Sequence, residues 1–163
     1  MKELSKYKLN KISSNLDYFF NIATSEDIKS GLNWYKNANN EANIIAKKYN
    51  LDVYKVSQVI SALSPRNKWN QNIKDSNKLC EAFCLGLNPE DIKVCTFHTN
   101  KFKAFNILAN NTEITSGSLK TFNFVNNIAY LNNDFLTIDI WHLRACFFND
   151  IKINNASIGK LAY

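Results

Sequence analysis

Apolar residues recur every three or four positions along most of the chain, which is the spacing of one face of an α-helix. Residues 9–23 predict a first amphipathic helix, and residues 33–49 predict another, in which alanines on the apolar stripe favour close helix packing. Between them, residues 24–27 resemble a helix cap followed by acidic first-turn residues. We therefore expect a short helix there that ends at Gly31.

Caps and breakers separate the helices that follow. Asp52 is expected to cap a core helix that the Ser-Pro pair at 64–65 stops, because the residue before a proline avoids the helical conformation. Residues 70–85 then continue as a helix. Residues 88–91 combine a cap, a proline and two acids, and they predict a short helix that ends near Cys95.

The pattern as a whole predicts an all-α fold. Residues 100–110 add one more helix, with His98 in the connection before it, and no strand alternation is longer than a few residues. We expect a single all-helical domain over residues 1–163, with nine or so helices and roughly 60–70% helix. Residues 156–163 look like the start of a helix that the chain does not finish, which indicates either truncation or a short docked turn.

The composition supports a folded domain with a core. Hydrophobic residues make up 45% of 163 residues, and only four glycines and two prolines interrupt them. No apolar run reaches about 18 residues, and the N-terminus lacks the apolar core of a signal peptide. These features argue against a disordered tail and a membrane span, so we expect a cytoplasmic protein.

The net charge of +6 suits a polyanionic partner, although such a charge is also common in proteins that bind none. Nearly all cationic residues are lysines, and Arg66 and Arg144 are the only arginines. They mark sites that need a forked, permanently charged donor, or they are simply two arginines.

The cysteines are expected to be reduced core thiols, since no CxxC pair is present. A zinc site assembled from Cys80, Cys84, Cys95 and His98 is a distant alternative. We expect no metal and no other cofactor.

Residues 64–72 gather basic, amide and aromatic side chains at the start of a helix. The favoured interpretation is a capped turn in which Trp69 is an anchor. The functional alternative is a loop that contacts nucleic acid, in which Arg66 and Lys68 bind phosphate and Trp69 stacks on a base.

Two features stand out in residues 117–146. A tight turn that contains Gly117 and Ser118 enters a helix at Lys120, and the N–H groups of such a turn can hold a phosphate while the lysine adds charge. Asp139 precedes another helix, so its simplest role is an N-cap, with Arg144 as an ion-pair partner.

The same stretch resembles the helix-hairpin-helix DNA glycosylases of the endonuclease III type. The resemblance lies in the segment Lys120-Thr121-Phe122-Asn123, in Ile138-Asp139, and in Arg144 five residues after the acid. It implies that Lys120 is a Schiff-base lysine, Asp139 the essential aspartate and Arg144 a supporting residue. It also implies two lobes, an inner one of about 33–131 and a terminal one of 1–30 with 139–163.

The chemistry that this resemblance implies is removal of a damaged or modified base that is flipped out of duplex DNA. Asp139 would stabilise the cationic sugar or activate a nucleophile, and Lys120 would attack C1′ if neutral or clamp a phosphate if protonated. Trp69, Trp141 or Tyr35 would stack on the base, and His142 lies among the expected nucleic-acid contacts.

Two other hypotheses remain open. The chain also resembles small uncharacterised phage-type proteins in residues 34–35, 62–72 and 137–139, a resemblance that carries no known activity. This resemblance implies the cytoplasm of a bacterium or of a phage-infected cell. Beside the enzyme, one hypothesis is a nucleic-acid-binding module of the same fold without chemistry. The other is a structural or accessory component of a phage in which Asp139 is only a cap.

Overall fold

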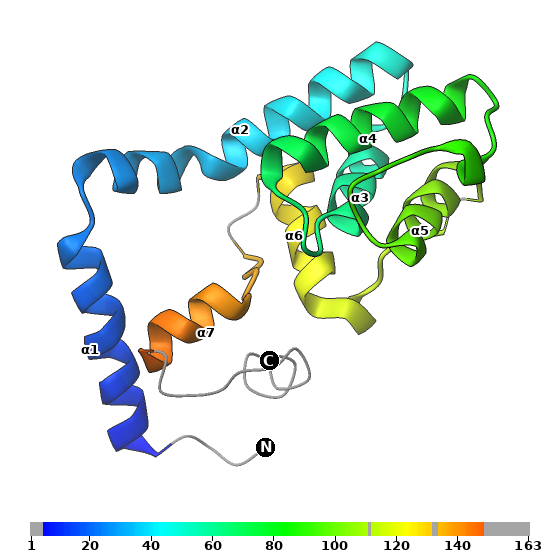
Figure 1. The fold of residues 1–163 in the computed structure, drawn as a ribbon. Coiled ribbons are helices and arrows are strands. Elements are labelled where there is room, and N and C mark those ends of the chain that lie inside the picture. Colours follow the sequence, from blue (N-terminus) through cyan, green and yellow to red (C-terminus); the bar gives the residue numbers. More distant parts are fainter. Residues whose placement is uncertain (1–4, 111, 132–133, 149–163) are drawn as a thin grey trace. The chain divides into compact units, whose positions relative to one another are not determined.

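The computed structural model describes residues 5–110, 112–131 and 134–148. Helices are the only regular elements in these ranges and include 76% of their residues, which confirms the all-α class (Figure 1). In chain order the elements are α1 (Lys6–Ile22), α2 (Ser25–Tyr49), α3 (Val53–Leu63), α4 (Trp69–Cys84), the 3-10 helix η1 (Pro89–Asp91), α5 (His98–Ala109), the 3-10 helix η2 (Ser116–Ser118), α6 (Leu119–Tyr130) and α7 (Ile140–Phe147). None of these described helices is both long and apolar enough to cross a bilayer.

The chain divides into two compact units. Unit 1 combines Met1–Asn33 with Ile138–Tyr163, and unit 2 is Trp34–Thr137. The first boundary falls inside α2. The glycosylase resemblance implies that two lobes, 33–131 and 1–30 with 139–163, bind a substrate between them. That arrangement of the lobes stays a prediction.

Unit 2 is built around α3. Eight consecutive residues of this helix, from Val56 to Leu63, are buried, because α4, α5 and α6 all pack against it (Figure 1). A helix that is covered on several faces buries its polar side chains as well as its apolar ones, so these polar groups need partners inside the protein.

The buried polar groups of α3 bind the backbone of other segments. The side-chain oxygen of Gln58 accepts a hydrogen bond from the N–H of Ile114 at 2.7 Å. The hydroxyl of Ser61 donates to the carbonyl of Thr121 at 3.0 Å. These two bonds fix the approach to α6 and its first turns, where Lys120 lies.

Two amides of α6 hold the irregular segment at 134–137, which ends unit 2. Asn123 donates to the carbonyl of Leu136 at 2.7 Å. Asn127 donates to the carbonyl of Phe135 at 2.8 Å and contacts the hydroxyl of Thr137 at 3.2 Å. Side chains of a helix therefore bind the carbonyl groups of this segment, a role that the neighbouring strand has in a β-sheet.

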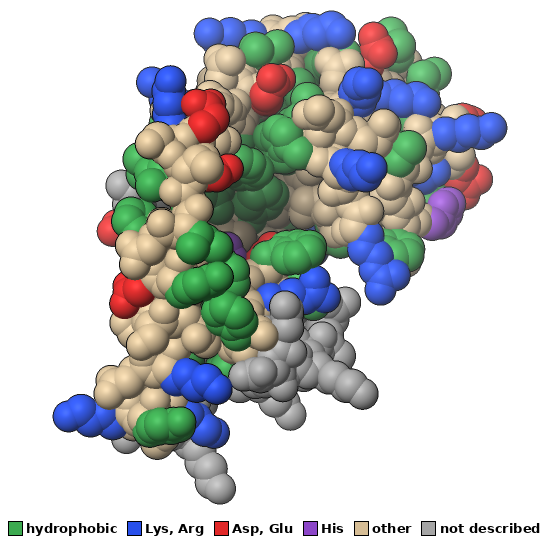
Figure 2. Space-filling view, turned by 60° about the vertical axis from the view of Figure 1, so that its left-hand side comes forward, with side chains coloured by type: hydrophobic (Ala, Val, Ile, Leu, Met, Phe, Trp, Pro, Cys, Tyr) green, Lys and Arg blue, Asp and Glu red, His purple; other side chains and the backbone are tan. Residues whose placement is uncertain are grey.

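Unit 1 pairs α1 with α7. Asn15 donates to the carbonyl of Cys146 at 2.7 Å, and the ring of Phe148 lies 5.3 Å from that of Tyr18 and 5.1 Å from that of Phe19. On α7, Leu143 is buried. No residue of α1 is buried, and hydrophobic side chains gather along it on the face shown in Figure 2.

Several predicted helix limits need correction. The helix that begins after Thr24 does not end at Gly31 but runs to Tyr49. Its predicted start is right, because the hydroxyl of Thr24 accepts from the N–H of Asp27 and the carboxylate of Asp27 accepts from the N–H of Thr24. One glycine costs a helix only about 1 kcal/mol, which the flanking helical turns outweigh.

Two further limits differ. The helix expected at 88–95 is the three-residue 3-10 helix η1, and His98 belongs to the first turn of α5 instead of a connection. The unfinished helix expected at 156–163 lies outside the described residues.

We predict that Gly31→Ala stabilises the protein by roughly 0.5–1 kcal/mol, because alanine loses less backbone entropy in a helix. A β-carbon at this position meets no atom within 4 Å. Gly86→Ala is the matched control, because Gly86 has a φ of +68° that alanine adopts only with strain. Urea unfolding should therefore move in opposite directions for the two variants, and destabilisation by Gly31→Ala would contradict a continuous α2.

Candidate active site

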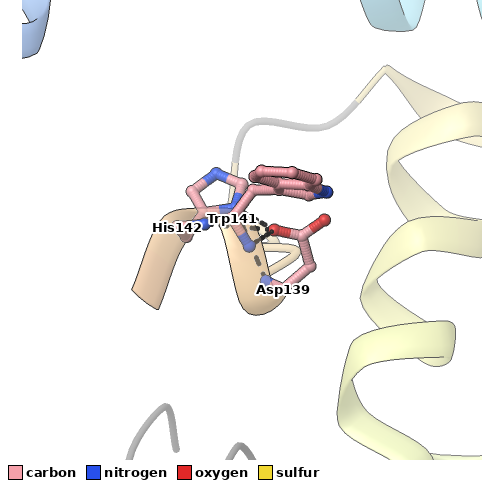
Figure 3. Close-up of polar contacts among 3 residues, drawn as sticks. All are labelled: Asp139, Trp141 and His142. Atoms are coloured by element: carbon pink, nitrogen blue, oxygen red, sulfur yellow. Dashed lines mark hydrogen bonds and ion pairs between the residues drawn. The ribbon is translucent and has the colours of Figure 1, made fainter. Parts of the chain in front are cut away.

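Asp139 is the N-cap of α7, as its position before an apolar helix predicts. Its Oδ1 accepts hydrogen bonds from the N–H of Trp141 at 2.9 Å and of His142 at 3.1 Å (Figure 3). The same oxygen lies 3.0 Å from Nδ1 of His142. This short contact favours the form of His142 that carries a proton on Nδ1, and the longer 3.5 Å contact of Nδ1 with the N–H of Asp139 then contributes little.

These donors keep Asp139 ionised. The side-chain hydrogen bond from His142, more than any other contact, lowers the pKa of Asp139 from 3.8 to about 2, and partial burial opposes the shift. Because folding lowers this pKa, the carboxylate stabilises the folded state fully above pH 3.8. That contribution is lost as the pH falls through about 2.

The second oxygen of Asp139 has a different environment. All the hydrogen bonds found for this carboxylate among the described residues are accepted by Oδ1, and Oδ2 points away from them (Figure 3). The side chain as a whole keeps 29% of its surface exposed. One oxygen therefore starts the helix, while the other accepts no hydrogen bond from the described part of the chain.

An aromatic ring and a cation lie beside this acid. Trp141 is 68% exposed, and the guanidinium carbon of Arg144 lies 4.7 Å from the centroid of its indole ring. The expected pairing of Arg144 with a carboxylate is thus replaced, among the described contacts, by a cation–π contact. Asp139, Trp141, His142 and Arg144 form a single cluster on α7, which we call the α7 acid cluster.

Lys120 belongs to the other unit. It is exposed in the first turn of α6, directly after η2, which contains Gly117 and Ser118. The structure therefore brings Lys120 together with the predicted turn, and it places the α7 acid cluster in unit 1 and Lys120 in unit 2.

Unit 2 also contains a group of touching aromatic rings, which we call the Trp34 cluster. The ring of Trp34 lies 5.0 Å from that of Tyr35, 4.8 Å from that of Trp69 and 5.8 Å from that of Phe124. All four side chains are half-buried. Phe124 follows Lys120 by one helical turn, so these two side chains leave α6 on the same side.

An arginine of the predicted basic loop at 64–72 contacts an aromatic ring from outside the loop. The guanidinium carbon of Arg66 lies 5.5 Å from the ring centroid of Phe97, and Lys68 is exposed two residues later. Trp69 packs against Trp34 in the Trp34 cluster, as the anchoring interpretation expects, and its stacking on a base stays a prediction.

A buried acid holds this loop in place. Asp75 is 3% exposed and accepts hydrogen bonds from Asn67 at 3.0 Å, from Gln71 at 2.9 Å and from the N–H of Cys95 at 2.9 Å. It thus joins residues 64–68 to residues 95–97. Sequence patterns did not reveal this role, because Asp75 sits inside a helix where an acid usually faces solvent.

The thiols are free and only partly in the core. Cys80 is buried, and burial raises its pKa to about 12, whereas Cys84 and Cys95 are exposed. In the described ranges, no group of three or more His, Cys, Asp or Glu side chains could hold a metal ion.

A family model matches residues 1–162, which is almost the whole chain. The chain belongs to DUF7178, a family of unknown function. No curated protein and no solved structure matches it. The functional hypotheses for this DUF7178 member therefore depend on the residues described above.

Sequence reasoning missed three contributors to these surfaces in the DUF7178 chain. Phe97 lies in the predicted connection before residue 100 and Phe124 lies within the predicted helix after Lys120, and only the fold shows that they meet Arg66 and Trp34. Asp75 had one available signal: its spacing of four residues from Gln71, which allows a side-chain hydrogen bond on one helix face.

We predict that the carboxyl carbon of Asp139, followed by NMR during an acid titration, has its midpoint near pH 2. In His142→Ala the midpoint should rise toward 3.8 but stay below it, because the N–H groups of residues 141 and 142 still donate. His98→Ala is the control and should leave the midpoint unchanged. A wild-type midpoint near 3.8 would show that His142 does not bind the carboxylate.

Asp75→Ala should lower the free energy of unfolding by about 1–3 kcal/mol, because it leaves donors of the 64–68 loop and of Cys95 without an acceptor. Asp91→Ala removes an exposed acid of the same unit and should change stability by less than about 0.5 kcal/mol. Urea denaturation measures both. Equal stability of the two variants would mean that Asp75 does not hold the loop.

Proposed function

We propose that this protein is a DNA glycosylase-like enzyme that removes a flipped damaged or modified base, with Asp139 as its essential acid. The observation that carries the proposal is the divided carboxylate of Asp139, whose Oδ1 is fixed by several donors while Oδ2 points away from them. A fixed and ionised carboxylate is suited to stabilise a sugar that becomes positively charged as its bond to the base breaks.

The reaction balances with water as the nucleophile. The bond between C1′ and the base nitrogen breaks, and the base leaves with the electron pair. Water adds its oxygen to C1′, and the proton that water loses is taken up by the departing base. Asp139 stabilises the cationic sugar between these steps, so its ionised form is the active one.

The aromatic and basic groups support binding of the substrate. Trp141 with Arg144 in unit 1, and the Trp34 cluster with Tyr35 and Trp69 in unit 2, offer flat rings on which a base can stack. Lys120 is exposed, and in this proposal it contacts a phosphate near Gly117 and Ser118. If Lys120 is instead the nucleophile, the enzyme is also a lyase.

A second candidate function is nucleic-acid binding without chemistry. The observation that favours it is the completeness of the cap, because bonds from Trp141 and His142 account for a helix N-terminus by themselves. In this candidate the basic residues bind phosphates and Asp139 only starts α7. Binding would then weaken steeply with salt but survive removal of the acidic charge.

The deciding experiment measures base release and borohydride trapping on duplex oligonucleotides that carry an abasic site, uracil, oxidised bases or hypermodified bases. Asp139→Asn keeps an N-cap acceptor but removes the charge, so we expect base release to fall by about 100-fold or more while DNA binding remains. Asp52→Asn is the matched control, because Asp52 caps α3 in the same way with a 3.0 Å bond to the N–H of Lys55.

Lysine variants separate the two roles of Lys120. Lys120→Ala should weaken DNA binding and lower the salt dependence by about one phosphate contact, compared with the exposed Lys103→Ala. A trapped adduct that disappears in Lys120→Ala identifies a lyase. The glycosylase proposal fails, and the binding module takes its place, if no substrate yields base release or an adduct while both Asp139→Asn and wild type bind DNA.

A further inference from the structure

The proposed function assigns no role to one exposed pair in unit 2, in which Arg66 lies over the ring of Phe97. Phe97 keeps 51% of its surface exposed although it is a large hydrophobic residue. The guanidinium carbon of Arg66 lies over the Phe97 ring, 5.5 Å from its centroid. Arg66 itself is exposed and adopts a left-handed backbone with a φ of 57°, which is uncommon for a residue other than glycine.

Contacts beneath this pair hold both of its segments. Asp75 accepts from Asn67, which follows Arg66, and from the N–H of Cys95, two residues before Phe97. The hydroxyl of Thr96 donates to the carbonyl of Pro65 at 3.3 Å. The two side chains are therefore presented by backbones that are joined to each other, which reduces the entropy that a ligand would have to remove.

The charge around the pair selects an anionic ligand. Residues 64–69 and 93–98 contain Arg66, Lys68 and Lys93, all at exposed positions, and the acid that joins these segments, Asp75, is buried. A guanidinium that lies against a ring still directs N–H groups from its edge, where a phosphate can accept them. An exposed aromatic ring among cations is the combination that binds a polyanion with flat hydrophobic groups, and nucleic acid has both properties.

Stacking on Phe97 would distinguish single-stranded from duplex nucleic acid. In a duplex both faces of each internal base are covered by neighbouring bases, whereas an unpaired base can turn one face to a protein ring. We infer that Arg66 and Phe97 form a binding site for an unpaired nucleotide, in which Phe97 stacks on the base and Arg66 binds an adjacent phosphate. This inference deepens the proposed function and rests on it only for the class of substrate.

The test compares a fluorescent oligothymidine strand with a duplex of the same length, by anisotropy at several salt concentrations. Phe97→Leu keeps an apolar side chain but removes the ring, and we expect it to weaken binding of the single strand about tenfold and binding of the duplex by less than about twofold. Arg66→Lys keeps the charge but loses the flat fork, and should also weaken the single strand more than the duplex.

Tyr130→Leu is the matched control. Tyr130 is exposed and its ring stacks on that of Tyr54 at 5.4 Å, so the variant removes an exposed aromatic pair of unit 2 without touching Arg66 or Phe97. It should leave both affinities unchanged. Thermal melting of each variant confirms that the fold is kept.

The outcomes separate this inference from the proposed function. Equal losses on the single strand and the duplex would mean that the pair contacts only phosphates, and unchanged affinities would mean that it contacts no nucleic acid. Either result overturns the inference and leaves base release by Asp139 to be judged by its own assay. Absence of binding to both oligonucleotides in the wild-type protein overturns the inference and the proposed function together.

Discussion

Burial of α3 is the constraint on which unit 2 depends. Eight successive residues from Val56 to Leu63 are removed from solvent, and a helix in that position can exist only if its polar side chains are hydrogen-bonded. Gln58 and Ser61 meet this need by binding Ile114 and Thr121. The bonds that make α3 acceptable in the core are therefore the ones that set the position of α6, and with it Lys120 and Phe124.

Each unit contains a helix that begins at a capping aspartate, Asp52 at α3 and Asp139 at α7, but the two carboxylates have different surroundings. Asp52 at α3 accepts a hydrogen bond from the backbone N–H of Lys55. Asp139 at α7 gathers three donors on a single oxygen, two of them from His142. Helix capping thus uses one oxygen of the carboxylate, and the proposed chemistry is assigned to the charge that the other oxygen shares.

Local signals predicted the fold better than the site. The apolar spacing, Asp52 and Asp139 as caps, and the Ser-Pro stop at 64–65 all act within one or two helical turns, so the sequence contains the information directly. Gly31 misled the prediction because a single weak helix former is outweighed by its neighbours. Asp75, Phe97 and Phe124 were missed because their partners are brought to them by tertiary packing, and no spacing rule describes such contacts.

In the segment from Phe135 to Thr137, asparagines of a helix donate to backbone carbonyls that a neighbouring strand would bind in a β-sheet. An extended apolar stretch normally offers its carbonyl groups to a strand of another molecule, which is a route to aggregation. Here Asn123 and Asn127 already occupy the carbonyls of Leu136 and Phe135. Two consecutive carbonyl groups of this segment are therefore bonded within the protein, which leaves fewer free acceptors for β-pairing with another molecule just before Asp139.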